Sequence, residues 1–234
     1  MFGWPSAKDC QSIMFVLNLL QKRSVQADRD VTKVRRKKMR KITLILVSLM
    51  FAGCFLTAQT YNIGDTGPGG GIVFYVSDVA FPVPQPNGET KMCRYMEVSP
   101  VDIGESQWGD GYEEDPHTLQ GLGPGLMNTY NIVSYNADNM TTANCAAYAC
   151  LKYSTQTTRK GEWWLPSRVE LNLLYKNLRD KVIATSSGNE EYGYCYWSSS
   201  QYSNINSWVQ RFSDGYQYGN NKDITLSVRA VRAF

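Results

Sequence analysis

The chain has 234 residues, enough for one or two domains, and its 43% apolar and 19% charged residues exclude a disordered or fibrous protein. Its net charge of +3 conceals a division, because residues 1–58 carry 11 basic and 3 acidic residues and residues 59–234 carry 13 and 18. A basic leader therefore precedes an acidic domain, and we expect no nucleic-acid partner. The single histidine, His117, excludes zinc sites built on several histidines and any two-histidine mechanism.

The leader combines a basic stretch with an apolar run. Residues 35–41 contain six Lys or Arg residues, and the 15 residues 42–56 that follow are mostly apolar. This order is typical of a secretory signal peptide, and 15 residues are short for a membrane span. We therefore predict a signal peptide at 39–58, with residues 1–38 an upstream extension outside the mature protein. The protein is expected in the periplasm, the cell envelope or at the cell surface; an uncleaved anchor helix is the alternative.

Two routes of processing compete at the end of this leader. Small residues lead up to Ala58, so cleavage there is favoured and makes Gln59 the first mature residue. The alternative is lipidation of Cys54, because the preceding residues end like a lipobox, although Phe51 stands where a branched aliphatic residue is usual. Membrane contact is expected only through the leader or this lipid anchor.

The domain at 59–234 begins with short strands and turns. It holds all 15 Tyr residues, which together with many Gly and Asn residues indicate a loop-rich fold. The glycine-rich segment 65–71 predicts a tight turn before a strand at 72–76, since a phosphate-binding loop would be followed by a helix. Three prolines predict a loop at 81–88, and a second strand is expected at 93–98.

An acidic, glycine-rich stretch occupies residues 103–125. Glu113, Glu114 and Asp115 could bind a cation such as calcium together with backbone carbonyls, but they lack the spacing of an EF-hand. We therefore favour a solvated loop and predict no cofactor, with calcium as the alternative that no motif supports. His117 lies in the same stretch and is expected at the surface.

Two helices are predicted next. The first spans 139–152, where alanines fall on one side. The second spans 167–180, because Ser167 and Glu170 form a capping box. It is supported by apolar residues at helical spacing: Leu171, Leu174, Tyr175 and Leu178.

The last part of the chain predicts three strands, at 194–198, 207–212 and 226–232. Three aromatic residues are expected in the core of these strands: Trp197, Trp208 and Phe212. Arg229 and Arg232 alternate with valines and are expected to form structural ion pairs.

The cysteines and serines offer no convincing catalytic constellation. Cys93, Cys145, Cys150 and Cys195 permit two disulfides with three possible pairings, and they lack the CxxC spacing of a zinc site. A bond between Cys145 and Cys150 requires a break in the predicted helix, since five helical residues turn the side chains about 140° apart. The serines at 198–200 lack the glycines of a nucleophile elbow. We therefore predict a protein that is not an enzyme.

Short motifs run through residues 60–234 in a fixed order: 63–75, 95–100, 108–109, Asn128-Thr129 with Ile132, Ala146-Ala147, 164–167, Glu170-Leu171, Leu174-Tyr175, 196–200, Trp208, Phe212, Gly215 and 228–232. In this order they resemble the Lcl C-terminal domain family. The resemblance implies a C-type-lectin-like α+β fold, shared with formylglycine-generating enzymes, in which two main helices pack on short antiparallel strands. It also implies a surface or periplasmic ligand-binding module.

Two departures qualify this resemblance. The formylglycine enzymes use a cysteine pair near the C-terminus, whereas Cys145 and Cys150 precede the Trp-Leu-Pro-Ser motif, so an oxidase is only an alternative. The triplets of calcium-dependent lectins are absent, so calcium-dependent sugar binding is not implied. A structural envelope protein is the other alternative.

The segment 198–222 has the composition of a binding surface. Of its 25 residues, 19 are Ser, Asn, Tyr, Gln, Gly or Asp, the set that antibody paratopes favour. A polar hairpin surface without a ligand has the same composition. We predict contact with a glycan or a surface protein through outward residues of this segment: Tyr202, Asn204, Asn206, Asp214, Tyr216, Tyr218 and Asn220.

Overall fold

The computed structural model describes residues 59–109, 116–139, 145–188 and 193–234, with positions 33, 35–37 and 39 of the leader; of 136–139 it describes the backbone alone. The predicted signal peptide with Cys54 lies almost entirely outside these residues, and the acids at 113–115 lie outside them as well. Residues Thr60–Phe234 form one compact unit. No helix in the described part of the chain has the length and apolar character of a membrane span.

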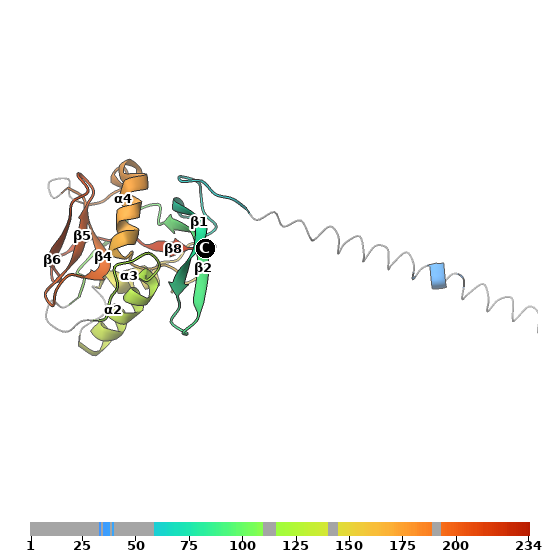
Figure 1. Cartoon of the computed structure of the whole chain (residues 1–234), viewed down its shortest axis with the longest axis horizontal. Helices are drawn as coiled ribbons and strands as arrows, with labels where there is room; N and C mark the ends of the chain where they lie inside the picture. Colours follow the sequence, from blue (N-terminus) through green and yellow to red (C-terminus); the bar gives the residue numbers. More distant parts are fainter. Residues whose placement is uncertain are drawn as a thin grey trace, which may run out of the picture. The chain divides into compact units, whose positions relative to one another are not determined.

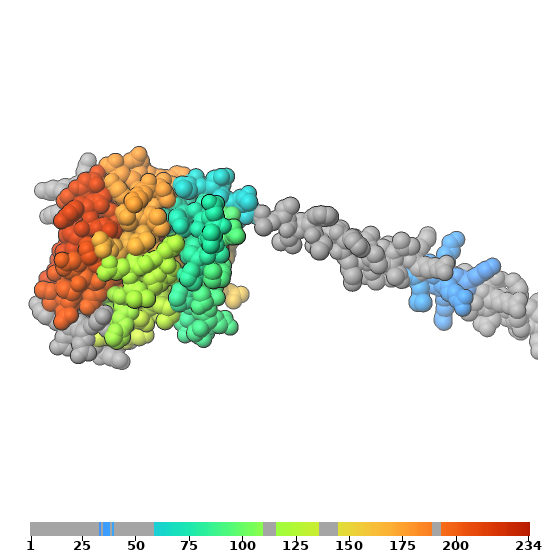
Figure 2. Space-filling view, viewed as in Figure 1, coloured from blue at the N-terminus to red at the C-terminus, as the bar shows by residue number. Residues whose placement is uncertain are grey.

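The unit is a mixed α+β structure in which helices lie between two sheets (Figure 1). One sheet has three strands in the order β1-β2-β8: Ile72–Pro84, Thr90–Val98 and Val231–Ala233. The other has five in the order β3-β7-β4-β5-β6: Glu105–Ser106, Leu226–Ser227, Cys195–Gln201, Asn206–Arg211 and Gln217–Asn221. Pairing is antiparallel except between β4 and β7. The space-filling view shows the same arrangement, with α4, in orange, between the strands of the two sheets (Figure 2).

In the described part of the domain, three helices lie between the sheets, one more than predicted: α2 (Gly125–Asn139), α3 (Ala146–Lys152) and α4 (Arg168–Ile183). Both α2 and α4 contact strands of each sheet. One core cluster joins α4 to β1, β2 and β4 and includes Phe74 and Leu174, which have no exposed surface. A second cluster includes the fully buried Trp163 and Trp197. Aromatic side chains of this size each bury about 150–250 Å² and dominate such cores.

The predicted helix at 139–152 is confirmed only over residues 146–152, where α3 lies, and its predicted start is wrong. Cys145 has extended backbone angles (φ −90°, ψ 127°) and precedes α3, while Asn139 is the last residue of α2. Helix α2 itself was not predicted, because Asn128 and Thr129 occupy its buried face beside Leu126. These polar side chains are satisfied by hydrogen bonds to distant segments, such as Asn128 Nδ2 to the carbonyl oxygen of Leu119. Their polarity breaks the apolar pattern by which a buried helix face is recognised.

The capping box of α4 is confirmed. Ser167 Oγ accepts from the Glu170 backbone N–H, and Glu170 Oε2 accepts from the Ser167 N–H at 2.9 Å. Glu170 is also fully buried and accepts from the N–H groups of Gly123 and Gly125. Burial raises the pKa of this carboxyl, against the opposing effect of its hydrogen bonds. The local cap thus also fastens the loop that leads into α2.

The predicted loop at 81–88 is replaced by strand over its first half. Strand β1 continues to Pro84, and Phe81 and Val83 are buried in the core. Because β1 is an edge strand, Pro82 and Pro84 can lack an N–H donor on the unpaired side. Only the turn after Pro84 remains a loop, closed by a hydrogen bond from the Gln85 N–H to the carbonyl oxygen of Glu89.

The glycine-rich segment 65–71 wraps around a buried carboxylate. Glu97, on β2, has no exposed surface and accepts hydrogen bonds from the N–H groups of Gly69 and Gly71, each at 2.9 Å. It also pairs with Arg232 at 2.6 Å. A Cβ added at Gly69 would lie 2.5 Å from the Glu97 Oε1 atom, so the close approach requires glycine. These backbone donors therefore bind the protein's own glutamate, and the predicted turn is confirmed.

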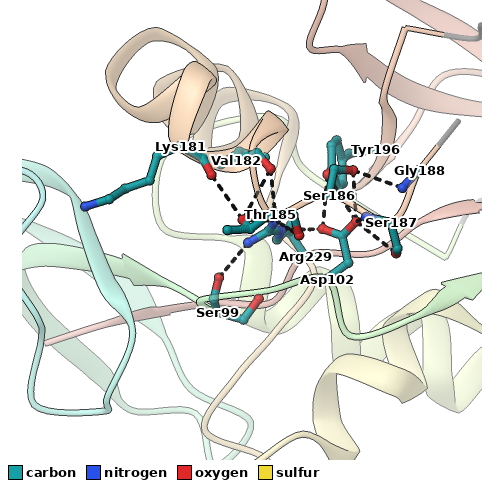
Figure 3. A network of polar contacts seen from close by, with 10 residues as sticks. All are labelled: Ser99, Asp102, Lys181, Val182, Thr185, Ser186, Ser187, Gly188, Tyr196 and Arg229. Atoms are coloured by element: carbon teal, nitrogen blue, oxygen red, sulfur yellow. Dashed lines mark hydrogen bonds and ion pairs between the residues drawn. The ribbon is translucent and has the colours of Figure 1, made fainter. Parts of the chain in front are cut away.

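The predicted strand at 226–232 is divided between the two sheets. Strand β7 pairs with β3 and β4, whereas β8 pairs with β2. Between them Arg229 is buried and forms an ion pair with Asp102 (Figure 3). Its Nη2 atom donates to the carbonyl oxygens of Val182 and Thr185, each at 3.1 Å, and so caps the end of α4. The structural ion pairs expected for Arg229 and Arg232 are confirmed.

Candidate binding surface

The predicted contact residues lie on the β5–β6 hairpin and the loop before it, but on two different faces. Trp208 is paired with Gly219, and Val209 with Tyr218. Paired residues of adjacent strands share a face, and neighbours along a strand point to opposite faces. Trp208 therefore lies on one face and Tyr218 on the other.

The Trp208 face carries a group of three side chains in contact, here called the Trp208 platform: Arg168, Tyr202 and Trp208. The Arg168 guanidinium carbon lies 3.6 Å from the centre of the Trp208 ring. Tyr202 meets the same indole edge-on, with ring centres 4.7 Å apart, and 55% of its surface is exposed. A Cβ at Gly219 would lie 2.6 Å from the Tyr202 ring, so glycine at this position lets the tyrosine lie against the hairpin.

Neutral side chains hold Arg168 in this position. Its Nε donates to Gln217 Oε1 at 3.1 Å, and its Nη1 donates to Gln120 Oε1 at 3.0 Å. Gln217 Nε2 donates back to the Arg168 carbonyl oxygen at 3.0 Å, which ties β6 to the first turn of α4. A stacked, hydrogen-bonded guanidinium loses little freedom on binding a ligand. The platform is therefore organised before a ligand arrives.

The prediction that Trp208 belongs to the core is wrong, whereas Trp197 and Phe212 are fully buried as expected. Trp208 is half-buried, and its Nε1 atom is inaccessible and has no hydrogen-bond partner in the described structure. A buried unpaired donor costs free energy. The indole nitrogen of Trp208 therefore does not add to the stability of the fold.

The opposite face carries the remaining tyrosines. Tyr216, 60% exposed, stacks on Tyr218 with ring centres 5.7 Å apart. The Tyr218 hydroxyl lies 3.4 Å from Cys195 Sγ, and burial raises the pKa of Tyr218 to about 12. Asp214 is exposed and pairs with Arg211, which lowers the pKa of this carboxyl to about 2. Asn220 shares this face, because it pairs with Ser207 next to Trp208.

The seven predicted contact residues therefore lie on two faces of the hairpin and in the loop before it, and they do not form one surface. Tyr202 joins the Trp208 platform, and Asn206 lies on the same face of β5 as Trp208. Asn204 is an exposed loop residue whose carbonyl oxygen accepts from Lys222 Nζ at 2.8 Å. Arg168 was missed, because it follows a helix cap and no local pattern marks it as a surface residue of the hairpin.

A buried network of polar contacts surrounds Asp102 (Figure 3). The Asp102 carboxylate accepts from Tyr196, Ser186 and Ser187 as well as from Arg229. Asp102 and Arg229 expose only 2% and 1% of their side chains. Burial and the Asp102 charge raise the pKa of Tyr196, so its hydroxyl stays protonated. The cluster holds segments together and offers a substrate no access.

The cysteine side chains of the described residues are also buried. Cys93 and Cys150 are buried thiols. The two disulfides that the sequence permits would need all four cysteines, so they are not both formed. Burial raises the pKa of Cys150 well above its usual value. A thiolate is the reactive form of cysteine, so this position disfavours oxidase chemistry. No three His, Cys, Asp or Glu side chains gather as a metal site among the described residues.

We expect Cys93 and Cys150 to resist alkylation in the folded protein, because both are buried and burial raises the pKa of both thiols. Iodoacetamide followed by peptide mass spectrometry measures this. Both residues should become modified in denaturant without any reductant. Modification only after reduction would show that the residue forms a disulfide.

No family model matches the chain, and no curated protein matches it. Among solved structures, the chain is similar to a fimbrial protein from Bacteroides ovatus ATCC 8483, with a TM-score of 0.46 and 16% sequence identity. The match covers 72% of this chain and 45% of that chain, so the present chain spans less than half of its neighbour's length. A similarity of this size carries no functional conclusion.

Proposed function

We propose that the protein is an exported, non-catalytic binding module of the cell envelope or surface, which holds a glycan or a surface protein on the Trp208 platform. The order of its motifs supports placing it with the Lcl C-terminal domain family and its C-type-lectin-like fold. The basic and apolar leader supports export. Formylglycine-type oxidation and a purely structural role remain the alternatives.

The arrangement of Arg168, Tyr202 and Trp208 carries this proposal. Trp, Tyr and Arg are the residues most enriched at binding hot spots. Here one of each lies in contact, with Arg168 over the Trp208 ring, Tyr202 edge-on to it, and Tyr202 more than half exposed. Tyr and Trp present a large contact area and lose little conformational entropy on binding, since each has two side-chain torsions. The opposite face has stacked tyrosines as well, but Tyr218 there is committed to a contact with Cys195.

The two exposed tyrosines of the hairpin region provide a matched test. Glycan and envelope-protein arrays probed with the full chain identify a ligand, and binding to it is then measured for Tyr202→Ala and Tyr216→Ala. Tyr202→Ala should weaken binding by more than about 1 kcal/mol, as removal of a hot-spot tyrosine does. Tyr216→Ala should bind as the unmodified chain does.

Both substitutions should leave thermal stability nearly unchanged, because exposed side chains contribute about 0.5 kcal/mol or less. If Tyr216→Ala abolishes binding and Tyr202→Ala does not, the ligand occupies the opposite face. If neither has an effect, the binding surface lies outside the hairpin.

A further inference from the structure

A cavity of about 250 Å³ opens beside the three-stranded sheet, apart from the residues of the Trp208 platform. It is formed by the hairpin ends of β1 and β2, the start of α2, the segment 161–164 and β8. Pockets for drug-sized ligands measure about 300–1,000 Å³, so this one suits a smaller molecule.

The floor of the cavity is apolar and rigid. Val83, Leu126 and Trp164 line it, and each exposes 4% or less of its surface. The Trp164 Nε1 atom donates to Glu170 Oε2 at 3.2 Å, which fixes the orientation of the indole. An occupant therefore meets hydrocarbon and an indole ring, with no polar group of the tryptophan left to satisfy.

The two basic side chains at the rim of the cavity differ in their ion pairing. Arg232 is already paired with Glu97 at 2.6 Å and with Glu162 at 3.6 Å. Lys91 is paired in register with Val83, so both side chains lie on the same face of the hairpin. Among the described residues Lys91 makes no ion pair, and its Nζ donates to the Ala233 carbonyl oxygen at 3.4 Å. Lys91 is thus a cation with no ion-pair partner among the described residues beside an apolar recess, while Glu162, which lines the same cavity, is paired with Arg232.

We propose that this cavity binds a small apolar carboxylic acid, with its hydrocarbon part on the floor and its carboxylate on Lys91. An anion at the rim compensates the charge of Lys91, and a charge-assisted hydrogen bond replaces the long contact to Ala233. A cationic ligand is disfavoured, because Glu162 is already paired with Arg232. The site is independent of the Trp208 platform and of the function proposed for it.

Phenylacetate and phenylacetamide are suitable probes, because they share a shape and differ in charge. Each is titrated into the nitrogen-15-labelled full chain while the indole N–H resonance of Trp164, assigned with Trp164→Phe, is followed. Phenylacetate should shift this resonance to saturation, and phenylacetamide should bind about tenfold more weakly, the contribution of one hydrogen bond to a charged group.

Lys91→Gln should reduce phenylacetate binding to the level of the amide, and Lys91→Arg should retain it. Both variants should fold, since Lys91 is exposed. Lys176→Gln, at an exposed position on α4, is the control for a general loss of positive charge. The absence of a saturable shift, equal binding of the two probes, or normal binding by Lys91→Gln would each overturn the proposal.

Discussion

Asp102→Ala should lower the free energy of unfolding by about 3–5 kcal/mol, the usual cost of removing one partner from a buried ion pair. The carboxylate is 2% exposed and accepts from Arg229, Tyr196, Ser186 and Ser187. Its loss leaves the Arg229 charge buried without compensation. Urea denaturation followed by circular dichroism measures the change.

The control is a second Arg–Asp pair in the same domain. Arg211 and Asp214 are exposed, and exposed pairs contribute little to stability. Asp214→Ala should therefore change the unfolding midpoint far less than Asp102→Ala. Arg229→Met combined with Asp102→Ala should cost less than the sum of the two single changes, because the uncompensated charge is gone. Equal effects of the two aspartate substitutions would show that burial of the Asp102 pair has no energetic consequence.

Glu97→Ala should be comparably destabilising, by about 3–5 kcal/mol, because it removes an acceptor of several donors at once. The N–H groups of Gly69 and Gly71 would lose their acceptor, and Arg232 would lose its shorter ion pair and keep only the one with Glu162 at 3.6 Å. Denaturant unfolding gives the size of the effect. Hydrogen exchange of the Gly69 and Gly71 amides tests its location, since both should exchange faster.

Glu89→Ala serves as the matched glutamate substitution on the β1–β2 hairpin. Glu89 is exposed, and its carboxylate accepts one hydrogen bond from the described residues, from Asn87 Nδ2 at 3.0 Å. We expect little change in stability and none in the exchange of Gly69 and Gly71. Protection of both glycine amides in Glu97→Ala would mean that the glycine turn holds its shape without the carboxylate.

Local patterns predicted local structure well. The cap of α4 was predicted correctly, because Ser167 and Glu170 satisfy each other three residues apart. The turn at 65–71 was recognised from its glycines, but the glutamate that requires them lies 26 or more residues away. A sequence pattern shows that a backbone is unusual and does not identify the distant group that it accommodates.

The misjudged positions share a dependence on remote partners. Trp208 was expected in the core with Trp197 and Phe212, but the alternation of a strand does not tell how deeply each residue of one face is covered. Trp208 proved half-buried because the first residue of α4, Arg168, covers it. The strand at 226–232 was predicted as one element, although Arg229 leaves the sheet to reach Asp102, 127 residues earlier. Contacts of this range leave no periodic trace in the sequence.

The passage of one short segment through both sheets has a consequence for how the chain folds. Strand β7 completes the five-stranded sheet and β8 the three-stranded sheet, with Val228, Arg229 and Ala230 buried between them. Glu97 and Arg232 are 135 residues apart in the chain, and Asp102 and Arg229 are 127 apart. Closing loops of this length costs entropy before their contacts form, which slows folding. Because three buried residues join β7 to β8, the last strand of one sheet cannot pair without bringing the last strand of the other into place. The two sheets should therefore unfold in a single cooperative transition.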